Sequence, residues 1–202
     1  MKKLSLAILL MIFISFTINA QTFVAKGDSR NQATFESNAA LEDIVGVSNE
    51  IEAMTMISPA DLSNASGTVK VDLTALKTGI DLRDEHLRSE NWLNTEKFPH
   101  AVFELKKVEG ASNLTDGKET SVKLHGDFTV HGVTKNVVAD GELTYYKESE
   151  KTKARIKGNL LKVTANFDIK LSDYGVNIPD MVIGKVDDNI KVSANFVASD
   201  AK

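Results

Sequence analysis

The fold is decided by one stretch, Val122-Lys-Leu-His-Gly-Asp-Phe-Thr-Val130, in which apolar or small residues alternate with polar ones. A period of two is typical of a β-strand that buries one face and exposes the other. After Gly132 the chain alternates again as far as Tyr145, so the two stretches predict a long β-hairpin. We interpret His131 as a turn residue that makes a local hydrogen bond.

The same alternation occurs on both sides of this hairpin. It predicts strands over 68–73, 101–105, 161–170 and 190–199, and over 47–57, where Pro59 ends the strand. The short runs 22–25 and 33–36 are interpreted as one edge strand with an interruption allowed between them, and 61–67 as turns. About eight strands, several longer than the usual ~5–6 residues, predict an all-β fold, a closed antiparallel barrel without exposed edges.

Residues 82–100 have a different pattern, because Leu82, Leu87, Trp92 and Leu93 recur at roughly helical spacing with charged residues between them. This spacing predicts a short helical cap on the barrel. For its charged side chains, a hydrogen-bonded network that fixes the cap to the barrel rim is favoured slightly over contact with a ligand headgroup. We expect the tryptophan to pack onto the barrel mouth. The candidate headgroup or cap residues are Arg83, Asp84, His86 and Trp92.

The N-terminal residues predict export. Lys2 and Lys3 precede an apolar run over 4–16, and Ala20 is a small residue before Gln21, which is the pattern of a signal peptide over 1–20. One domain over 21–202 then remains, in the periplasm or secreted. The apolar run is shorter than the ~20 residues that span a bilayer, so we expect no stable membrane insertion after cleavage.

Composition narrows the classes of partner. The chain has no cysteine, so a disulfide framework is excluded. Its formal net charge is -4, and nucleic-acid binding depends on clustered Lys and Arg, so we expect no nucleic-acid partner.

Three blocks of the sequence are similar to one known family. The first is Thr78-Gly79 with Arg83-Asp-Glu-His-Leu87, followed by Phe98-Pro99 and Phe103. The second lies within 122–138 and contains Gly126 and Thr129-Val-His-Gly-Val-Thr-Lys135, and the third is Ser172-Asp-Tyr-Gly175 followed by Ile183-Gly184 and Val186. With them the chain resembles the YceI-like family of exported polyisoprenoid- and lipid-binding proteins. The resemblance implies a lipocalin-like barrel that holds an apolar chain in its pore, with a polar head near one mouth. Residues 39–57 depart from the family's aromatic and glycine-containing first hairpin, so the shape of one wall and the ligand length stay open.

The inward faces of the predicted strands carry several small residues, Gly126, Ala139, Gly141, Ala165 and Ala194. A barrel of about eight strands is either filled by its side chains or holds one small ligand, and the pattern alone leaves both open. The candidate pore-lining residues are Phe103, Leu105, Leu124, Phe128, Val130, Val163, Ala165, Phe167, Val192, Ala194 and Phe196.

No residue is assigned to catalysis, a metal or a cofactor. His125 and His131 share a face but lie roughly 20 Å apart along a strand, too far to share one ion. The chain has no cysteine nucleophile and no Gly-x-Ser-x-Gly elbow. The leading hypothesis is a non-enzymatic periplasmic carrier of an isoprenoid or other long-chain lipid, with quinones among the candidates. The alternatives are an enzyme acting on a lipid or quinone, with His86 and a nearby carboxylate as acid and base, and a secreted interaction protein with a filled barrel. A homodimer stays open.

Overall fold

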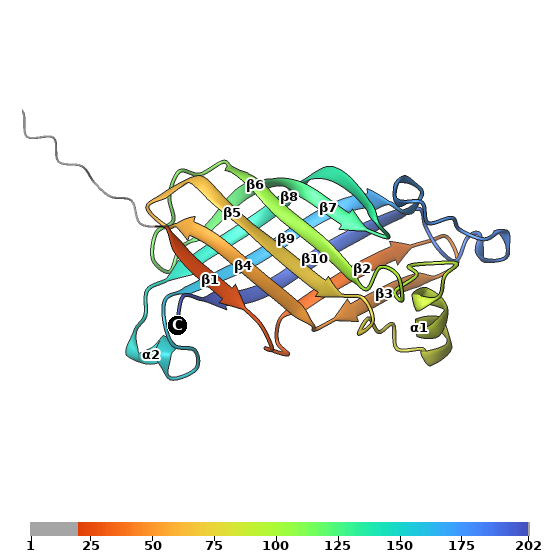
Figure 1. The fold of residues 1–202 in the computed structure, drawn as a ribbon, viewed down its shortest axis with the longest axis horizontal. Helices are drawn as coiled ribbons and strands as arrows, with labels where there is room; N and C mark the ends of the chain where they lie inside the picture. Colours follow the sequence, from red (N-terminus) through yellow and green to blue (C-terminus); the bar gives the residue numbers. More distant parts are fainter. Residues whose placement is uncertain (1–19, 202) are drawn as a thin grey trace, which may run out of the picture.

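The computed structural model describes residues 20–201, and most of them form one β-barrel (Figure 1). The predicted signal peptide, apart from Ala20, lies outside the described residues. The strands are β1 (Gln21–Ala25), β2 (Gln32–Asn38), β3 (Asp43–Ser48), β4 (Ile51–Ser58), β5 (Asp61–Asp72), β6 (His100–Glu109), β7 (Glu119–Val130), β8 (Val133–Tyr146), β9 (Leu160–Lys170) and β10 (Asn189–Ser199). The helices are α1 (Asp81–Arg88) and α2 (Glu150–Lys153), with 3-10 turns η1 (Leu171–Tyr174) and η2 (Asp180–Val182).

Eight of the strands close the barrel. They follow the order β1-β4-β5-β6-β7-β8-β9-β10, and Val24 of β1 pairs with Ser199 of β10 to complete the ring. Every pairing is antiparallel. The predicted fold class, a closed antiparallel barrel with a short helical cap, is therefore confirmed.

One wall is built from interrupted strands. Strand β2 pairs with β10 over Ile190–Asn195, and β1 pairs with β10 further along at Ser199, so β1 and β2 follow one another beside the same neighbour. At the break, Asn31 turns inward and its Oδ1 accepts the N–H of Val197 at 3.0 Å, in place of a backbone partner. The interruption that the sequence left open is present, because β1 ends at Ala25 and β2 begins at Gln32. The edge-strand interpretation is wrong, because both segments have neighbours on two sides, β4 or β3 on one and β10 on the other.

Strand β5 begins earlier than its sequence suggests. We predicted turns over 61–67, but β5 starts at Asp61 and Gly67 pairs with both Thr55 and Leu105. A side chain at Gly67 would place its Cβ 2.7 Å from the carbonyl oxygen of Met54, so glycine fits a close approach of two strands here. Long-range pairing thus overrides the local turn preference of Ser, Asn and Gly.

The hairpin of β7 and β8 is the one predicted. Val130 pairs with Val133, and the two turn residues have positive φ, 52° at His131 and 76° at Gly132, as a type I′ turn requires. The prediction of a local hydrogen bond for His131 is wrong, because its Nδ1 lies 3.0 Å from the carbonyl oxygen of Tyr174 on η1, which is distant in the sequence. The ring of Phe98 also packs against the His131 ring, with centroids 5.2 Å apart. The hairpin tip is therefore fixed to other segments at the same end of the barrel.

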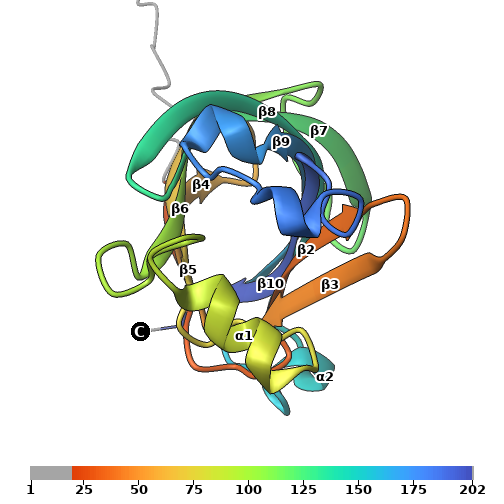
Figure 2. The ribbon, with the colours of Figure 1, turned by 90° about the vertical axis from the view of Figure 1, so that its right-hand side faces the viewer.

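The two ends of the barrel are built differently. The C-terminus and α2 lie at one end, and α1 lies at the other (Figure 1). Looking into that second end, α1 crosses one side of the opening and the segment with η1 and η2 covers part of the other side (Figure 2). The buried apolar residues form two clusters, one that includes Phe23 and one that includes Tyr174. Within residues 20–201, no helix is long and apolar enough to cross a membrane.

Candidate ligand-binding cavity

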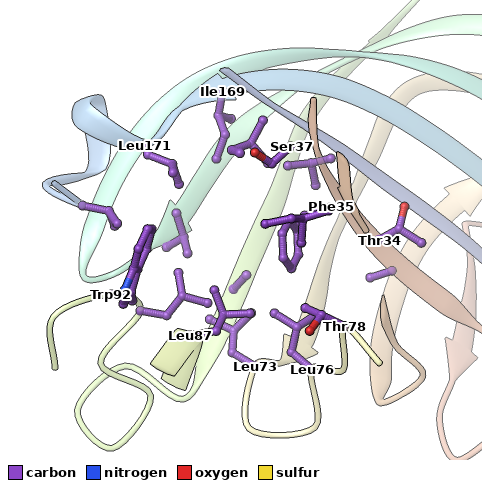
Figure 3. A pocket seen from close by; sticks show the side chains of 18 of the residues that line it. Thr34, Phe35, Ser37, Leu73, Leu76, Thr78, Leu87, Trp92, Ile169 and Leu171 are labelled. Atoms are coloured by element: carbon purple, nitrogen blue, oxygen red, sulfur yellow. The ribbon is translucent and has the colours of Figure 1, made fainter. Parts of the chain in front are cut away.

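The α1 end of the barrel encloses a cavity of about 440 Å³. Inward-facing residues of β2, β5, β6, β7, β9 and β10 form its walls, and α1 with its following turn forms one side of the mouth. Phe35, Leu73, Leu76, Leu87 and Trp92 surround the space from different elements (Figure 3). The volume lies within the ~300–1,000 Å³ that is usual for small-molecule sites.

The candidate pore residues divide between the cavity and the solid part of the barrel. Residues in the cavity wall are Phe103, Phe128, Val130, Phe167, Val192 and Ala194. Residues packed in the apolar cluster of the other end, away from the cavity, are Leu105, Leu124, Val163, Ala165 and Phe196. Alternation indicates that a side chain points inward, but it does not give its depth along the pore. The residues of the second group therefore point into the barrel without lining the cavity.

Glycines in the α2 half make room for large neighbours. A Cβ at Gly126 would lie 2.5 Å from the Phe103 ring, and a Cβ at Gly141 would lie 2.8 Å from a methyl carbon of Leu124. These glycines therefore leave room for large side chains of the neighbouring strands, and the buried apolar cluster fills this half of the barrel. The open and the filled interpretations of the pore each describe one half.

The cap is shorter than its apolar spacing predicts. Helix α1 ends at Arg88, where the Ser89 hydroxyl donates to the carbonyl oxygen of His86 at 2.6 Å. Trp92 follows in the turn rather than in the helix, and its ring lines the cavity (Figure 3). Leu93 is buried, whereas Leu82 is largely exposed at the mouth. Helical periodicity thus found the residues that face the barrel but overestimated the length of the helix.

Asp84 is a structural carboxylate. It is 1% exposed, and its Oδ1 accepts hydrogen bonds from the backbone N–H of Thr78 at 2.7 Å and from the Thr78 hydroxyl at 2.6 Å. Burial alone would raise the pKa of Asp84, but the hydrogen bonds of Thr78 and the positive charges of Lys77 and Arg88 outweigh it and lower that pKa. An ionised Asp84 therefore holds the start of α1 against the segment that follows β5.

Arg83 continues this network to the facing rim. Its Nε donates to the Thr78 hydroxyl at 2.9 Å and its Nη2 to the Thr78 carbonyl oxygen at 3.0 Å. Its Nη1 donates to Oε1 of Glu42 at 2.6 Å, so α1 is joined to the turn between β2 and β3. These contacts are those of a network that fixes the cap to the rim. Arg83 and His86 also line the mouth of the cavity.

Sequence reasoning missed several residues of this mouth. Thr78 and Tyr174 lie within or beside blocks of the family resemblance, so that signal could have found them. Glu42 belongs to the atypical stretch 39–57 and had no such signal. Lys185 lines the mouth from the segment after η2, where no alternation marks its direction.

The rim of the mouth carries exposed apolar side chains. Met181 is 86% exposed, Leu41 75%, Ile183 65% and Leu82 61%, and these are the most exposed large apolar residues of the described chain. They come from the β2–β3 turn, from α1 and from the η2 segment. A backbone hydrogen bond of 2.8 Å from Leu41 to Gly184 joins two of these segments. Apolar surface therefore continues from the cavity to the outside of its mouth.

Comparisons with known proteins agree with this architecture. A UPF0312 protein of Vibrio cholerae is 28% identical over 146 residues, which cover 70% of this chain and 74% of that relative. A UPF0312 protein of Shewanella denitrificans is 30% identical over 141 residues, or 68% of this chain and 71% of the relative. A solved polyisoprenoid binding domain from Saccharophagus degradans has a TM-score of 0.66 at 15% identity and covers 90% of this chain and 99% of its own, a likeness of fold. Residues 16–198 match the model of the YceI-like domain, and the chain therefore belongs to the YceI-like domain family.

Proposed function

We propose that this protein is a non-enzymatic carrier that binds an isoprenoid or other long-chain lipid in the cavity of its barrel. The observation that carries the proposal is the cavity of about 440 Å³, which has apolar walls, ends inside the barrel and opens beside α1. The polyisoprenoid binding domain among the structural neighbours supports the choice of an isoprenoid. The signal-peptide pattern of residues 1–20 supports a carrier that works in the periplasm or outside the cell.

An apolar chain is the ligand class that gains most from this cavity. Each buried methylene contributes about 0.8 kcal/mol, whereas a polar group buried without a hydrogen bond costs several kcal/mol. The walls offer Phe, Leu, Ile and Val side chains from the strands and a tryptophan from the cap. Affinity in our proposal comes from the chain, not from a charged anchor deep in the barrel.

Polar groups at the mouth suit a head that stays near water. Arg83, His86 and Lys185 line this part of the cavity, and they sit beside the exposed apolar rim. The Arg83 guanidinium already bonds Thr78 and Glu42, so its first role is to hold the cap. In the proposal these groups orient the head, and entry takes place across the rim.

Mass spectrometry of an organic extract tests the proposal. The wild-type protein, purified from cells without added lipid, should release a long-chain lipid in amounts comparable with the protein. Ala194→Phe should remain folded and release much less, because residue 194 lines the cavity and the new ring would occupy it. Equal extracts from the two proteins, or none from the wild type and no uptake of farnesol or palmitate when either is added, would contradict a carrier of lipids.

A further inference from the structure

The cavity ends on a floor of aromatic rings. Phe103 lies on β6 and Phe167 on β9, and two strands, β7 and β8, separate these in the barrel wall. Their ring centroids are nevertheless only 6.1 Å apart, and Phe128 on β7 meets the Phe167 ring edge-on at 5.0 Å. Since the contact joins strands that are not neighbours, the rings meet across the lumen.

This floor is the boundary between the two halves of the barrel. Phe103 and Phe167 pack against both buried clusters, the filled one toward α2 and the one beside α1. Both also line the cavity. The Phe103 ring lies over Gly126 of the next strand. A Cβ at residue 126 would lie 2.5 Å from this ring, so the ring can occupy this position only because residue 126 is a glycine.

The distance from floor to mouth is short. The cavity is lined from Val69 on β5 to Leu73 directly after this strand, and along β10 from Ile190 to Ala194. At ~3.3 Å per residue each of these spans is roughly 13 Å long. A cavity of ~150 Å³ binds benzene, with six carbons, so one of about 440 Å³ has room for on the order of fifteen carbons.

We propose that the floor of Phe103, Phe128 and Phe167 limits the apolar chain that this cavity accepts to about fifteen carbons, as in a prenyl chain of three isoprene units or a palmitoyl-sized acyl chain. The inference rests on the proposed lipid-binding function and adds a length limit to it. Carbons beyond this length stay outside the mouth and add little affinity. Phe103 is the residue of the floor that sets the limit, because Gly126 allows its ring to reach into the lumen.

A series of fatty acids from octanoate to tetracosanoate tests the limit, with binding followed by titration calorimetry on the full mature chain. In the wild type, affinity should rise about fourfold for each added methylene, as its burial predicts, and level off near palmitate. Phe103→Ala should move that plateau to longer chains, by no more carbons than the lost ring contains. Phe23→Ala removes the same ring from the filled half, where Phe23 is fully buried, and should leave the plateau unchanged.

The possible outcomes distinguish a failure of the length limit from a failure of the proposed lipid-binding function. If affinity keeps rising well beyond palmitate, or if the two variants have the same plateau, the floor does not set the length although lipid binding stands. If no fatty acid or prenyl alcohol binds the wild type at all, the proposed function falls and the length limit with it. Phe103→Leu and Phe23→Leu, compared in the same way, replace the alanine pair if either alanine variant does not fold.

Discussion

The two halves of this barrel have the same alternation of side chains, but one half is filled and the other encloses a cavity. In the α2 half, Gly126 leaves room for the Phe103 ring and Gly141 leaves room for Leu124 on the neighbouring strands, and the inward side chains pack into one buried cluster. In the α1 half, large residues such as Leu73 and Ile169 face one another across a cavity of about 440 Å³. Whether a barrel is a core or a container is therefore decided by the space that its inward side chains leave, and not by how apolar its strands are.

The halves also differ in how their walls are held. The α2 half is closed by β1, which pairs with β4 over its whole length and with β10 at Val24 and Ser199. The α1 half is completed by β2 and β3, by a backbone bridge between Val47 and Lys77, and by the side-chain network around Thr78. A mouth held by side-chain hydrogen bonds and one backbone bridge can open locally at a smaller cost than the paired strands of the wall, which suits the place where a ligand would enter.

The largest predicted difference between the halves comes from adding volume. Ala139 is 1% exposed in the filled half, and Ala139→Phe should lower the free energy of unfolding by ~1–3 kcal/mol or more through overpacking. Ala194 lines the cavity, so Ala194→Phe should cost clearly less stability while weakening lipid binding, because the new ring takes up part of the cavity. Chemical denaturation with a lipid titration on both variants measures the contrast. Similar stability losses at both positions would show that the α1 half is also filled.

A smaller effect is expected from acid at the cap. The folded pKa of Asp84 is lower than its ordinary value of 3.8, so its ionised form stabilises the folded state above that pH. The stabilisation should be lost as the pH falls below 3.8 and through the folded pKa. Thermal unfolding of the wild type and Asp84→Asn should therefore differ at neutral pH, by ~1–3 kcal/mol if a buried hydrogen bond is lost, and converge in acid. A difference that persists at the lowest pH would remove this role from Asp84.

The smallest effect concerns the link between the cap and the opposite rim. Arg83 and Glu42 are both partly exposed, so their ion pair should contribute only ~0.2–1 kcal/mol in a double-mutant cycle of Arg83→Ala and Glu42→Ala. If the link only fixes the cap, Arg83→Ala should weaken binding of palmitate and of hexadecane equally. A larger loss of affinity for palmitate than for hexadecane would show that Arg83 also contacts the headgroup.

Much of the fold could be predicted because it follows from local patterns. The hairpin of β7 and β8 has strict alternation and a turn whose glycine tolerates positive φ, and both are visible in the sequence. The cap was found for the same reason, from the spacing of Leu87, Trp92 and Leu93. Its helix is shorter than predicted, because the Ser89 hydroxyl donates to the carbonyl oxygen of His86 at the end of the helix and the chain then turns.

The rest depends on contacts between distant segments. The turn-like residues 61–67 form a strand only because β4 and β6 pair with them on both sides. The break near Asn31 is stabilised by Val197, far away in the sequence. The depth of each pore residue follows from the register of neighbouring strands, which explains why Leu124 and Phe128, both inward on one strand, lie in different halves.

The fluorescence of Trp92 tests the central claim most directly, because it is the only tryptophan of the chain and lines the cavity of the α1 half. Farnesol added to the mature protein should shift the Trp92 emission to shorter wavelength in a saturable manner, as the indole exchanges water for an apolar neighbour. The same titration of Ala194→Phe should need a higher farnesol concentration for the same shift, since the new ring takes up part of the cavity. An unchanged Trp92 spectrum in the wild type at saturating farnesol would contradict a ligand cavity at this end of the barrel.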